Sequence, residues 1–291
     1  MINWKLMKVI SWFENGVRKV FSQENPLSFF TGHIWKKTVG LLYMRVPFLE
    51  NVYRPIIDRT RYKLYLTRGL FSTILYRYPS MKREDEIFLA HFLKPNMVYV
   101  DVGANIGTTT LAGAYAVGEK GKVIAFEPHP RTFQYLTDSV NLNPDLAKRI
   151  ILKHVALGEK KGETHISDLL MNDINHVGDE GIPVELTTLD DALKDVAHID
   201  LLKIDVEGYE KQVFLGAQEV LGKTDAIYFE VCEPNFSRFH YTADDLFEIL
   251  EGANFTIHSV NENDHSLTQV HKGYRSSGSE AYENLLALRK K

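Results

Sequence analysis

Apolar and polar positions follow two rhythms along residues 84–291. Short apolar runs, typical of buried strands, alternate with segments whose apolar residues recur at helical spacing. The runs predict strands over 97–102, 122–126, 150–157, 198–206, 226–231, 255–260 and 284–288, with an extra short strand at 184–186. The helical segments are 80–93, 106–117, 130–142, 210–221 and 242–252, with a helical turn near 190–193. Strands separated by helices imply right-handed crossovers. The pattern therefore predicts a doubly wound α/β fold with a mainly parallel, seven-stranded sheet.

The first 83 residues differ from the rest in charge and in aromatic content. They hold 15 Lys/Arg against four Asp/Glu, a net of +11, whereas residues 84–291 hold 19 against 34, a net of −15. All three Trp lie in this region, and residues 3–22 show the spacing of a basic amphipathic helix. Between residues 31 and 78 the pattern has no clean period. We therefore divide the chain into an arm, residues 1–83, and a body, residues 84–291.

Composition excludes several classes of protein. A chain of 291 residues with 44% apolar and 25% charged residues is not wholly disordered. Its single cysteine, Cys232, excludes a disulfide framework and favours a reducing compartment, so we expect a cytoplasmic protein. No CxxC occurs and no two of the 11 His lie three or four residues apart, so we expect no resident metal. No run is long and apolar enough to predict a membrane span.

The sharpest chemical signal is VYVDVGANIGTTT, residues 98–110. An apolar strand runs through Asp101 into a turn with Gly103 and Gly107 and then into a helix. Such a turn lets the backbone approach a ligand closely. Its spacing, D-x-G-x-x-x-G, departs from the nicotinamide fingerprint, and it lacks a Walker lysine. Glu127 ends the next strand, where a carboxylate can accept hydrogen bonds from two ribose hydroxyls. Turn and acid together predict an adenosine site; the alternative is a tight turn beside an incidental surface glutamate.

Asp101 at the entrance of this turn discriminates between adenosine ligands. Its negative charge would repel a diphosphate. It suits a ligand that carries an ammonium and a sulfonium group, which points to S-adenosylmethionine.

A second signal is IDLLKIDVEGYE, residues 199–210. On a strand, Lys203, Asp205 and Glu207 share one face. Charges on a core strand are costly unless the strand end opens into a site. In the usual doubly wound order this strand neighbours the strand at 97–102, so Asp205 and Glu207 should face the methyl donor. The alternative is a Lys203–Asp205 ion pair at the rim of the sheet.

The sequence resembles the FkbM-type, class I (Rossmann-like) S-adenosylmethionine-dependent methyltransferases. The resemblance spans about residues 84–290 and rests on VYVDVGANIGTTTLAGA, GKVIAFEPHPRTFQYL, NLNP, HVALGEKKGE, TTLDD, IDLLKIDVEGYEKQVFLGAQEVL and YFEV. It implies that the turn lines the methionine end of the donor and that the end of the second strand takes the ribose. The donor residues so implied are Asp101, Gly103, Ala104, Asn105, Gly107, Thr108, Glu127 and Pro128. Asp205 matches the acid that borders the active site.

The resemblance implies O-methylation of a hydroxyl on a sugar, a glycolipid or a small metabolite, with S-adenosylhomocysteine as product. The reaction is an in-line displacement that needs a base, for which Asp205 and Glu207 are the candidates. Lys203 would orient a carboxylate or polarise the acceptor. Glu230 is a less favoured base, and His129 is expected to be a surface residue at the rim.

Three alternatives stay open. Asp205 and Glu207 could hold Mg²⁺ with waters, although the reading without metal is favoured. The chain could be a nicotinamide-dependent oxidoreductase. It could also be a non-catalytic adenosine-fold module that docks on a membrane or a partner.

Three hypotheses account for the arm. It packs as a cap on the acidic body, it forms a homodimer contact, or it docks peripherally on the inner membrane surface. In the last case it would present a lipid-linked glycan to the site. Nucleic acid is not expected as a partner, because the acidic body would repel phosphates.

Overall fold

The computed structural model describes residues 56–58, 61–67, 72, 75, 84–169, 175–261, 264–274 and 282–290. The amphipathic helix expected over residues 3–22 lies outside this range and stays a prediction. Within the described part, no helix combines the length and the apolar character needed to cross a membrane.

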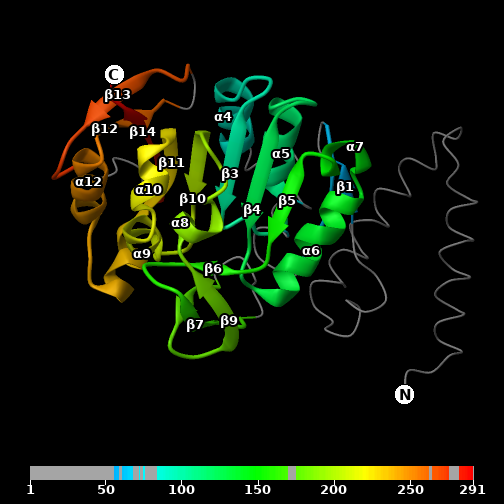
Figure 1. Cartoon of the computed structure of the whole chain (residues 1–291), viewed down its shortest axis with the longest axis horizontal. Coiled ribbons are helices and arrows are strands. Elements are labelled where there is room, and N and C mark those ends of the chain that lie inside the picture. Colours follow the sequence, from blue (N-terminus) through cyan, green and yellow to red (C-terminus); the bar gives the residue numbers. More distant parts are fainter. Residues whose placement is uncertain are drawn as a thin grey trace, which may run out of the picture.

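The main sheet has eight strands among the described residues, in the order β13-β12-β14-β11-β10-β3-β4-β5 (Figure 1). Their bounds are β3 Val98–Val102, β4 Lys122–Phe126, β5 Ile150–Lys153, β10 Ile199–Ile204, β11 Thr224–Cys232, β12 Phe255–Val260, β13 Leu267–Val270 and β14 Tyr282–Arg289. Strands β5, β4, β3, β10 and β11 are parallel neighbours, and β14 is antiparallel to β11 and to β12. The doubly wound, mainly parallel α/β fold is confirmed, and β10 lies beside β3 as expected.

The predicted number of strands was wrong by one. The extra strand, β13, pairs with β12 at the edge of the sheet. Its residues are exposed except for Val270, so no buried face produced an apolar period in the sequence.

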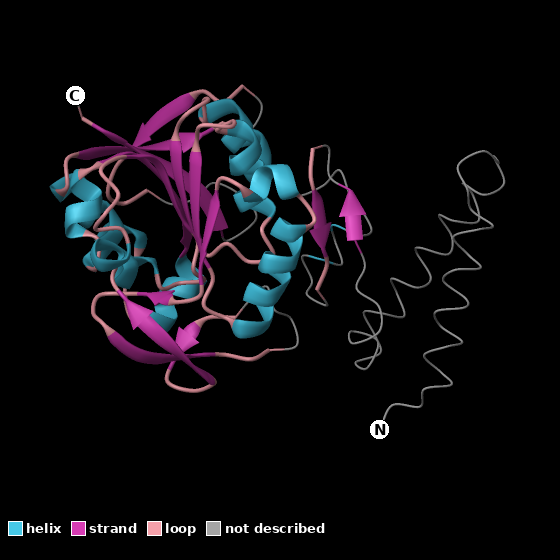
Figure 2. Cartoon of the chain, turned by 45° about the vertical axis from the view of Figure 1, so that its right-hand side comes forward, coloured by secondary structure: helices cyan, strands magenta, loops and turns pink. Residues whose placement is uncertain are grey.

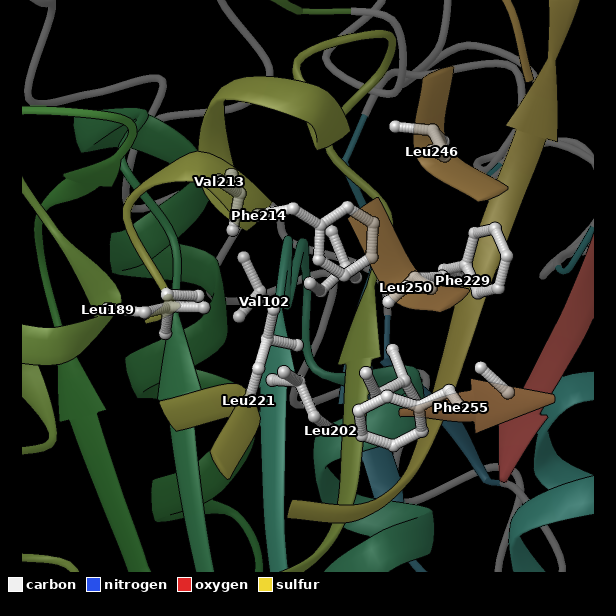
Figure 3. Close-up of a cluster of buried hydrophobic side chains, with 14 of the residues drawn as sticks. Val102, Leu189, Leu202, Val213, Phe214, Leu221, Phe229, Leu246, Leu250 and Phe255 are labelled. Atoms are coloured by element: carbon white, nitrogen blue, oxygen red, sulfur yellow. The ribbon is translucent and has the colours of Figure 1, made fainter. Parts of the chain in front are cut away.

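Helices cover both faces of the sheet (Figure 2). One face carries α4 Glu84–Phe92, α5 Thr108–Ala116, α6 Pro130–Asn141 and α7 Pro144–Ala147. The other carries α8 Leu189–Ala192, α9 Glu210–Leu215, α10 Gln218–Gly222 and α12 Ala243–Gly252. Figure 3 shows the second core, where Val102 and Leu202 of the sheet meet Phe214, Leu246 and Leu250 of the helices. Two apolar layers thus fix the sheet and with it the positions of the strand ends.

A second, four-stranded sheet lies at the carboxyl ends of the main strands, at the bottom of Figure 1. Its order is β6-β9-β7-β8, with bounds β6 Ala156–Leu157, β9 Ile182–Thr187, β7 Gly162–Ile166 and β8 Val177–Gly178. The strand predicted over 150–157 therefore splits, because β5 stays in the main sheet and β6 joins the second one. Of this sheet the sequence predicted only 184–186, since its strands are short and partly exposed.

The helix predicted over 210–221 also splits, into α9 and α10. Gly216 ends α9, and a Cβ there would lie 2.0 Å from the carbonyl oxygen of Gly158. The break thus lets the backbone pass close to the loop after β6. The remaining elements are α11 Glu233–Phe236 and the short 3-10 helix η3 Ser237–Phe239.

Part of the region assigned to the arm packs on the body. The hairpin of β1 Ile56–Asp58 and β2 Lys63–Tyr65 leads into Leu66 and lies on the outer side of α5 and α6 (Figure 2). Leu64 and Leu66 are both fully buried and belong to the same hydrophobic cluster as residues of these helices. Lys63 and Asn143 exchange hydrogen bonds of 2.9 and 2.8 Å. The domain boundary at residue 83 stays a prediction. The described hairpin precedes this boundary in the sequence but packs on the body.

Candidate active site

A cavity lies at the carboxyl ends of β3, β4 and β10, where the second sheet covers them. Six of the predicted site residues line it: Gly103, Asn105, Glu127, Pro128, Asp205 and Glu207. Five do not: Asp101, Ala104, Gly107, Thr108 and Lys203. The two motifs recognised in the sequence thus meet in one place, and their individual roles stay predictions.

The turn after β3 contacts the ends of both strands that flank β3, namely β4 and β10. The N–H groups of Gly103 and Ala104 both donate to the carbonyl of Phe126, at 3.1 and 2.9 Å. Gly103 has φ +82°, and a Cβ there would lie 1.7 Å from the carbonyl oxygen of Asp205. Only glycine fits both the backbone conformation and the contact. This contact holds the donor turn against the end of β10.

Glu127 ends β4 and lines the cavity with a side chain that is 7% exposed. Its two oxygens accept backbone N–H groups, Oε2 from Asn105 at 3.0 Å and Oε1 from His129 at 2.9 Å. Burial raises the pKa of Glu127 to about 7, although these two hydrogen bonds favour the charged form. The carboxylate is therefore clamped between the two loops that flank the predicted ribose position.

Asp101 does not line the cavity, contrary to the expectation that it touches the donor. It is fully buried, and its Oδ2 accepts hydrogen bonds from Thr109 at 2.9 Å and Thr110 at 2.6 Å. It thus ties β3 to the first turn of α5. Its part in donor binding stays a prediction.

Lys203 and Asp205 form the ion pair that was the alternative reading of this strand. Lys203 Nζ lies 2.9 Å from Asp205 Oδ2 and 4.0 Å from Asp101 Oδ1. The lysine side chain is 2% exposed and that of Asp205 is 31% exposed. Burial alone would lower the pKa of Lys203, but the two aspartates outweigh it and hold the pKa above its usual value. Of the two roles predicted for Lys203, the geometry fits orienting Asp205, because so buried an ammonium cannot reach an acceptor.

Glu207 does not share a strand face with Lys203 and Asp205, since β10 ends at Ile204 and Glu207 has φ +56° in the following turn. Its Oε2 accepts a hydrogen bond of 3.1 Å from Asn235. Burial and the neighbouring Asp205 raise the pKa of Glu207 to about 8. Buried Glu210 supports the turn by accepting N–H groups of Val206 and Gly208. The turn, rather than strand periodicity, brings Glu207 to the cavity.

His129 is not the surface residue that the sequence suggested. It is 1% exposed, and its Nδ1 accepts the backbone N–H of Thr132 and so caps α6. Its Nε2 lies 3.4 Å from Asp168, which also binds Arg131 at 2.9 Å. Burial lowers the pKa of His129. The residue therefore joins the donor loop to the segment after β7.

Sequence reasoning missed the walls of the cavity. They come from the loop after β5 and from the second sheet and include Val155, Ala156, Ile166, His176, Val177 and Tyr209. The motif HVALG was recognised, but nothing in it predicts that the chain leaves the main sheet after β5 and joins the second sheet at β6. β7, which carries Ile166, has the sequence GETHI with a single buried apolar residue, and β8, which carries Val177, has two residues, so neither gives a periodic signal.

One group of three His and Asp side chains in the described part lies close enough to share a cation: His198, Asp200 and Asp225. It lies at the amino ends of β10 and β11, whereas the cavity lies at the carboxyl ends of the strands. The alternative that Asp205 and Glu207 hold Mg²⁺ stays a prediction.

Comparison with known proteins decides the family. A family model described as a methyltransferase FkbM domain matches residues 101–257, more than half of the chain. The chain belongs to the FkbM methyltransferase family. Hexuronic acid methyltransferase AglP of Haloferax volcanii is 27% identical over 164 residues, 54% of this chain and 66% of that protein. 2-O-methyltransferase NoeI of Sinorhizobium fredii is 29% identical over 160 residues, 47% of this chain and 64% of that protein. The match spans just under two thirds of both relatives.

Solved structures show weaker likenesses. An S-adenosylmethionine-dependent O-methyltransferase of Thermotoga maritima has a TM-score of 0.44 at 16% identity, covering 81% of this chain and 78% of that one. A precorrin-6y C5,15-methyltransferase of Geobacter metallireducens has a TM-score of 0.42 at 12% identity, covering 72% and 90%. Scores this low carry no argument about function.

The donor of this FkbM chain is S-adenosylmethionine, and the cavity residues fit it. The Oδ1 of Asn105 is buried at the cavity without a hydrogen-bond partner, so it can accept from a ligand N–H group. Glu127 offers a carboxylate at the end of β4.

Proposed function

We propose that the protein transfers the methyl group of S-adenosylmethionine to a hydroxyl of a sugar, a glycolipid or a small metabolite. The observation that carries this proposal is the shared cavity, in which the donor residues Asn105 and Glu127 face the acids Asp205 and Glu207. The names of the relatives add support, since one denotes a hexuronic acid methyltransferase and the other a 2-O-methyltransferase.

S-adenosylmethionine supplies an electrophilic methyl group when it is bound. The protein's part is positioning and proton transfer. Positioning contributes up to about 7–11 kcal/mol when the reacting atoms are held in line. The Gly103 turn provides it here, because its contact with the Asp205 carbonyl fixes the donor turn relative to the end of β10.

Asp205 is the first candidate for the base that takes the hydroxyl proton. Its carboxylate lines the cavity, and the ammonium of Lys203 orients it through Oδ2. Glu207 suits a different role, because a pKa of about 8 keeps its carboxyl mostly protonated at neutral pH. In that state it can donate a hydrogen bond to the acceptor. The pair resembles other sites in which environment separates the roles of two carboxyl groups.

The test is a transfer assay with S-adenosylmethionine tritiated in its methyl group and a panel of neutral, amino and acidic glycosides. The proposal predicts label on an oxygen of at least one glycoside and formation of S-adenosylhomocysteine. Donor binding without label transfer to any member would contradict transfer to a sugar and support the non-catalytic alternative.

A further inference from the structure

A second group of polar side chains lies beside the cavity, on the face of the sheet that α4 covers. Because β14 runs antiparallel to β11, its amino end meets the carboxyl end of β11. Glu230 of β11 pairs there with Asn284 of β14. Asp85 of α4 accepts hydrogen bonds from Asn284 at 3.0 Å and from the Tyr228 hydroxyl at 2.9 Å. We call Asp85, Glu230 and Asn284 the polar edge.

The polar edge contains two buried oxygens that lack a hydrogen-bond partner, Glu230 Oε2 and Asn284 Oδ1. Such atoms are rare, since an unpaired buried polar group costs about 1–3 kcal/mol. The amide nitrogen of Asn284 is already used by Asp85. Burial raises the pKa of Glu230 well above its usual value, so its carboxyl brings one proton of its own, and the polar edge can accept further O–H or N–H donors from a ligand.

The edge adjoins the proposed chemistry through β10. Lys203 of β10 pairs with Asp101 on one side and with Tyr228 on the other, so these side chains share a face of the sheet. Asp205 follows on β10's end, lines the cavity and binds Lys203. A molecule that reaches Asp205 from this side meets the polar edge.

The groups around the edge are carboxyls. Asp205 is paired with Lys203, and burial raises the pKa of Asp85, Glu207 and Glu230, so these carboxyls resist ionisation. The buried cation among them, Lys203, is held by Asp205 and Asp101 and is 2% exposed. It therefore cannot serve as a partner for an anion in a ligand. An acidic group of a ligand would lose its hydration there without gaining a cation as partner.

We propose that the polar edge is the acceptor subsite and that it takes a polyhydroxyl acceptor without an acidic group, an uncharged sugar or an amino sugar. Hydroxyls donate to Glu230 Oε2 and Asn284 Oδ1 while the reacting hydroxyl lies at Asp205. This assignment rests on the proposed methyl transfer and narrows it, and it differs from the hexuronic acid named for one relative.

Two p-nitrophenyl glycosides that differ only at C6, a β-glucoside and a β-glucuronide, provide the matched probes, with the 2-amino-2-deoxy glucoside as a third. Transfer of tritiated methyl from S-adenosylmethionine is measured against the concentration of each. We expect the glucoside or the amino glucoside to be methylated with kcat/KM at least about tenfold above that of the glucuronide. Preference for the glucuronide would overturn the proposal.

Variants locate the subsite. Glu230→Gln and Asn284→Ala should each raise the KM for the preferred glycoside about tenfold and leave the affinity for S-adenosylhomocysteine within about twofold. Glu185→Gln is the matched control, because Glu185 is exposed on β9 and loses the same charge. Thermal unfolding shows whether each variant is folded; if one is not, Glu230→Asp, which keeps the carboxylate but shortens its reach, takes its place.

The outcomes separate the two proposals. If S-adenosylhomocysteine binds and none of the three glycosides is methylated, the polar edge is not a sugar subsite, whereas donor binding stands. If the KM for the glycoside is unchanged in both edge variants, the subsite lies elsewhere. If S-adenosylhomocysteine does not bind, the proposed function itself fails.

Discussion

The proposed donor half and the proposed acceptor half of the site are built differently. The donor half, at the ends of β3 and β4, is shaped by backbone: a glycine turn against the Asp205 carbonyl and a glutamate clamped by two N–H groups. The acceptor half, at the ends of β10 and β11, is shaped by side chains: the Lys203–Asp205 pair, Glu207 and the polar edge. Backbone shape suits a fixed cofactor, whereas side chains can change with the acceptor.

The difference also sets how each half responds to substitution. In the donor half a single methyl group meets backbone, which cannot move aside. In the acceptor half a change of charge can leave the shape intact. We therefore expect a side chain added to the glycine turn to impair fold and binding together, and changes of charge in the acceptor half to impair acceptor use or turnover while the fold stays intact.

The largest effect is expected for Gly103→Ala. The new Cβ would lie 1.7 Å from the Asp205 carbonyl oxygen at a φ of +82°, so the turn must move. We expect a loss of more than about 3 kcal/mol in the free energy of unfolding, or at least about a hundredfold weaker binding of S-adenosylhomocysteine. Denaturant unfolding and calorimetric titration measure the two quantities.

Gly222→Ala is the matched control, because a Cβ at Gly222 meets nothing within 4 Å. It should leave both quantities nearly unchanged. A Gly103→Ala protein that folds and binds like the wild type would show that the donor half is not shaped by this contact.

Asp205→Asn should lower kcat by at least about two orders of magnitude, within the range for loss of a general base. The shape is kept, so the unfolding temperature should change far less. The readout is methyl transfer to the preferred glycoside, with exposed Asp225→Asn as the control. Full activity eliminates Asp205 as the base, and activity restored by Mg²⁺ would favour the metal alternative.

The donor half was the more predictable one. Its turn and its glutamate lie in contiguous motifs, so Gly103 and Glu127 could be placed at the cavity from spacing, and Asn105 from the family resemblance. That Asp101 does not line the cavity could not be predicted, because a sequence does not show that Thr109 and Thr110 of the next helix donate to its Oδ2. Glu207 was assigned to a strand face, because the spacing of the charged residues does not show that Glu207 has a positive φ and lies in a turn.

The acceptor half and the roof of the cavity depend on distant pairings. Glu230 and Asn284 are 54 residues apart in the sequence. They lie side by side only because β14 pairs with β11. The second sheet is made of strands as short as two residues. Local periodicity carries no information about either, whereas it did predict the alternation of the main strands and helices.

Titration of Glu127, in the donor half, should change how the free energy of unfolding depends on pH. Its folded pKa of about 7 lies above the usual 4.5, so the folded protein keeps a proton that the unfolded chain has released between these values. Its contribution to stability is therefore lost as pH rises through this window, by up to about 3 kcal/mol. Unfolding of Glu127→Gln between pH 5 and 7.5 should show a flatter dependence than wild type, while Glu210, whose pKa is also raised to about 7, keeps its share in both. Parallel curves would contradict the assignment.

The smallest effect concerns the arm, whose membrane docking we propose from sequence alone. Its net +11 should bring the protein down with anionic vesicles at low salt but not at about 0.5 M salt, where screening is strong. A variant with Lys→Glu at 5 and 8 and Arg18→Glu should stay in the supernatant. Lys→Glu at exposed positions 120, 122 and 160 is the control. Wild-type protein that never sediments would leave the arm as a cap or an oligomer contact.

The most direct test of the central claim is calorimetric titration of the protein with S-adenosylhomocysteine and, separately, with NAD. We predict that S-adenosylhomocysteine binds, that NAD does not, and that Glu127→Ala weakens the first at least about tenfold while thermal unfolding shows the fold intact. Binding of NAD without S-adenosylhomocysteine would contradict the account and favour an oxidoreductase. An unchanged affinity in Glu127→Ala would show that the end of β4 does not hold the donor.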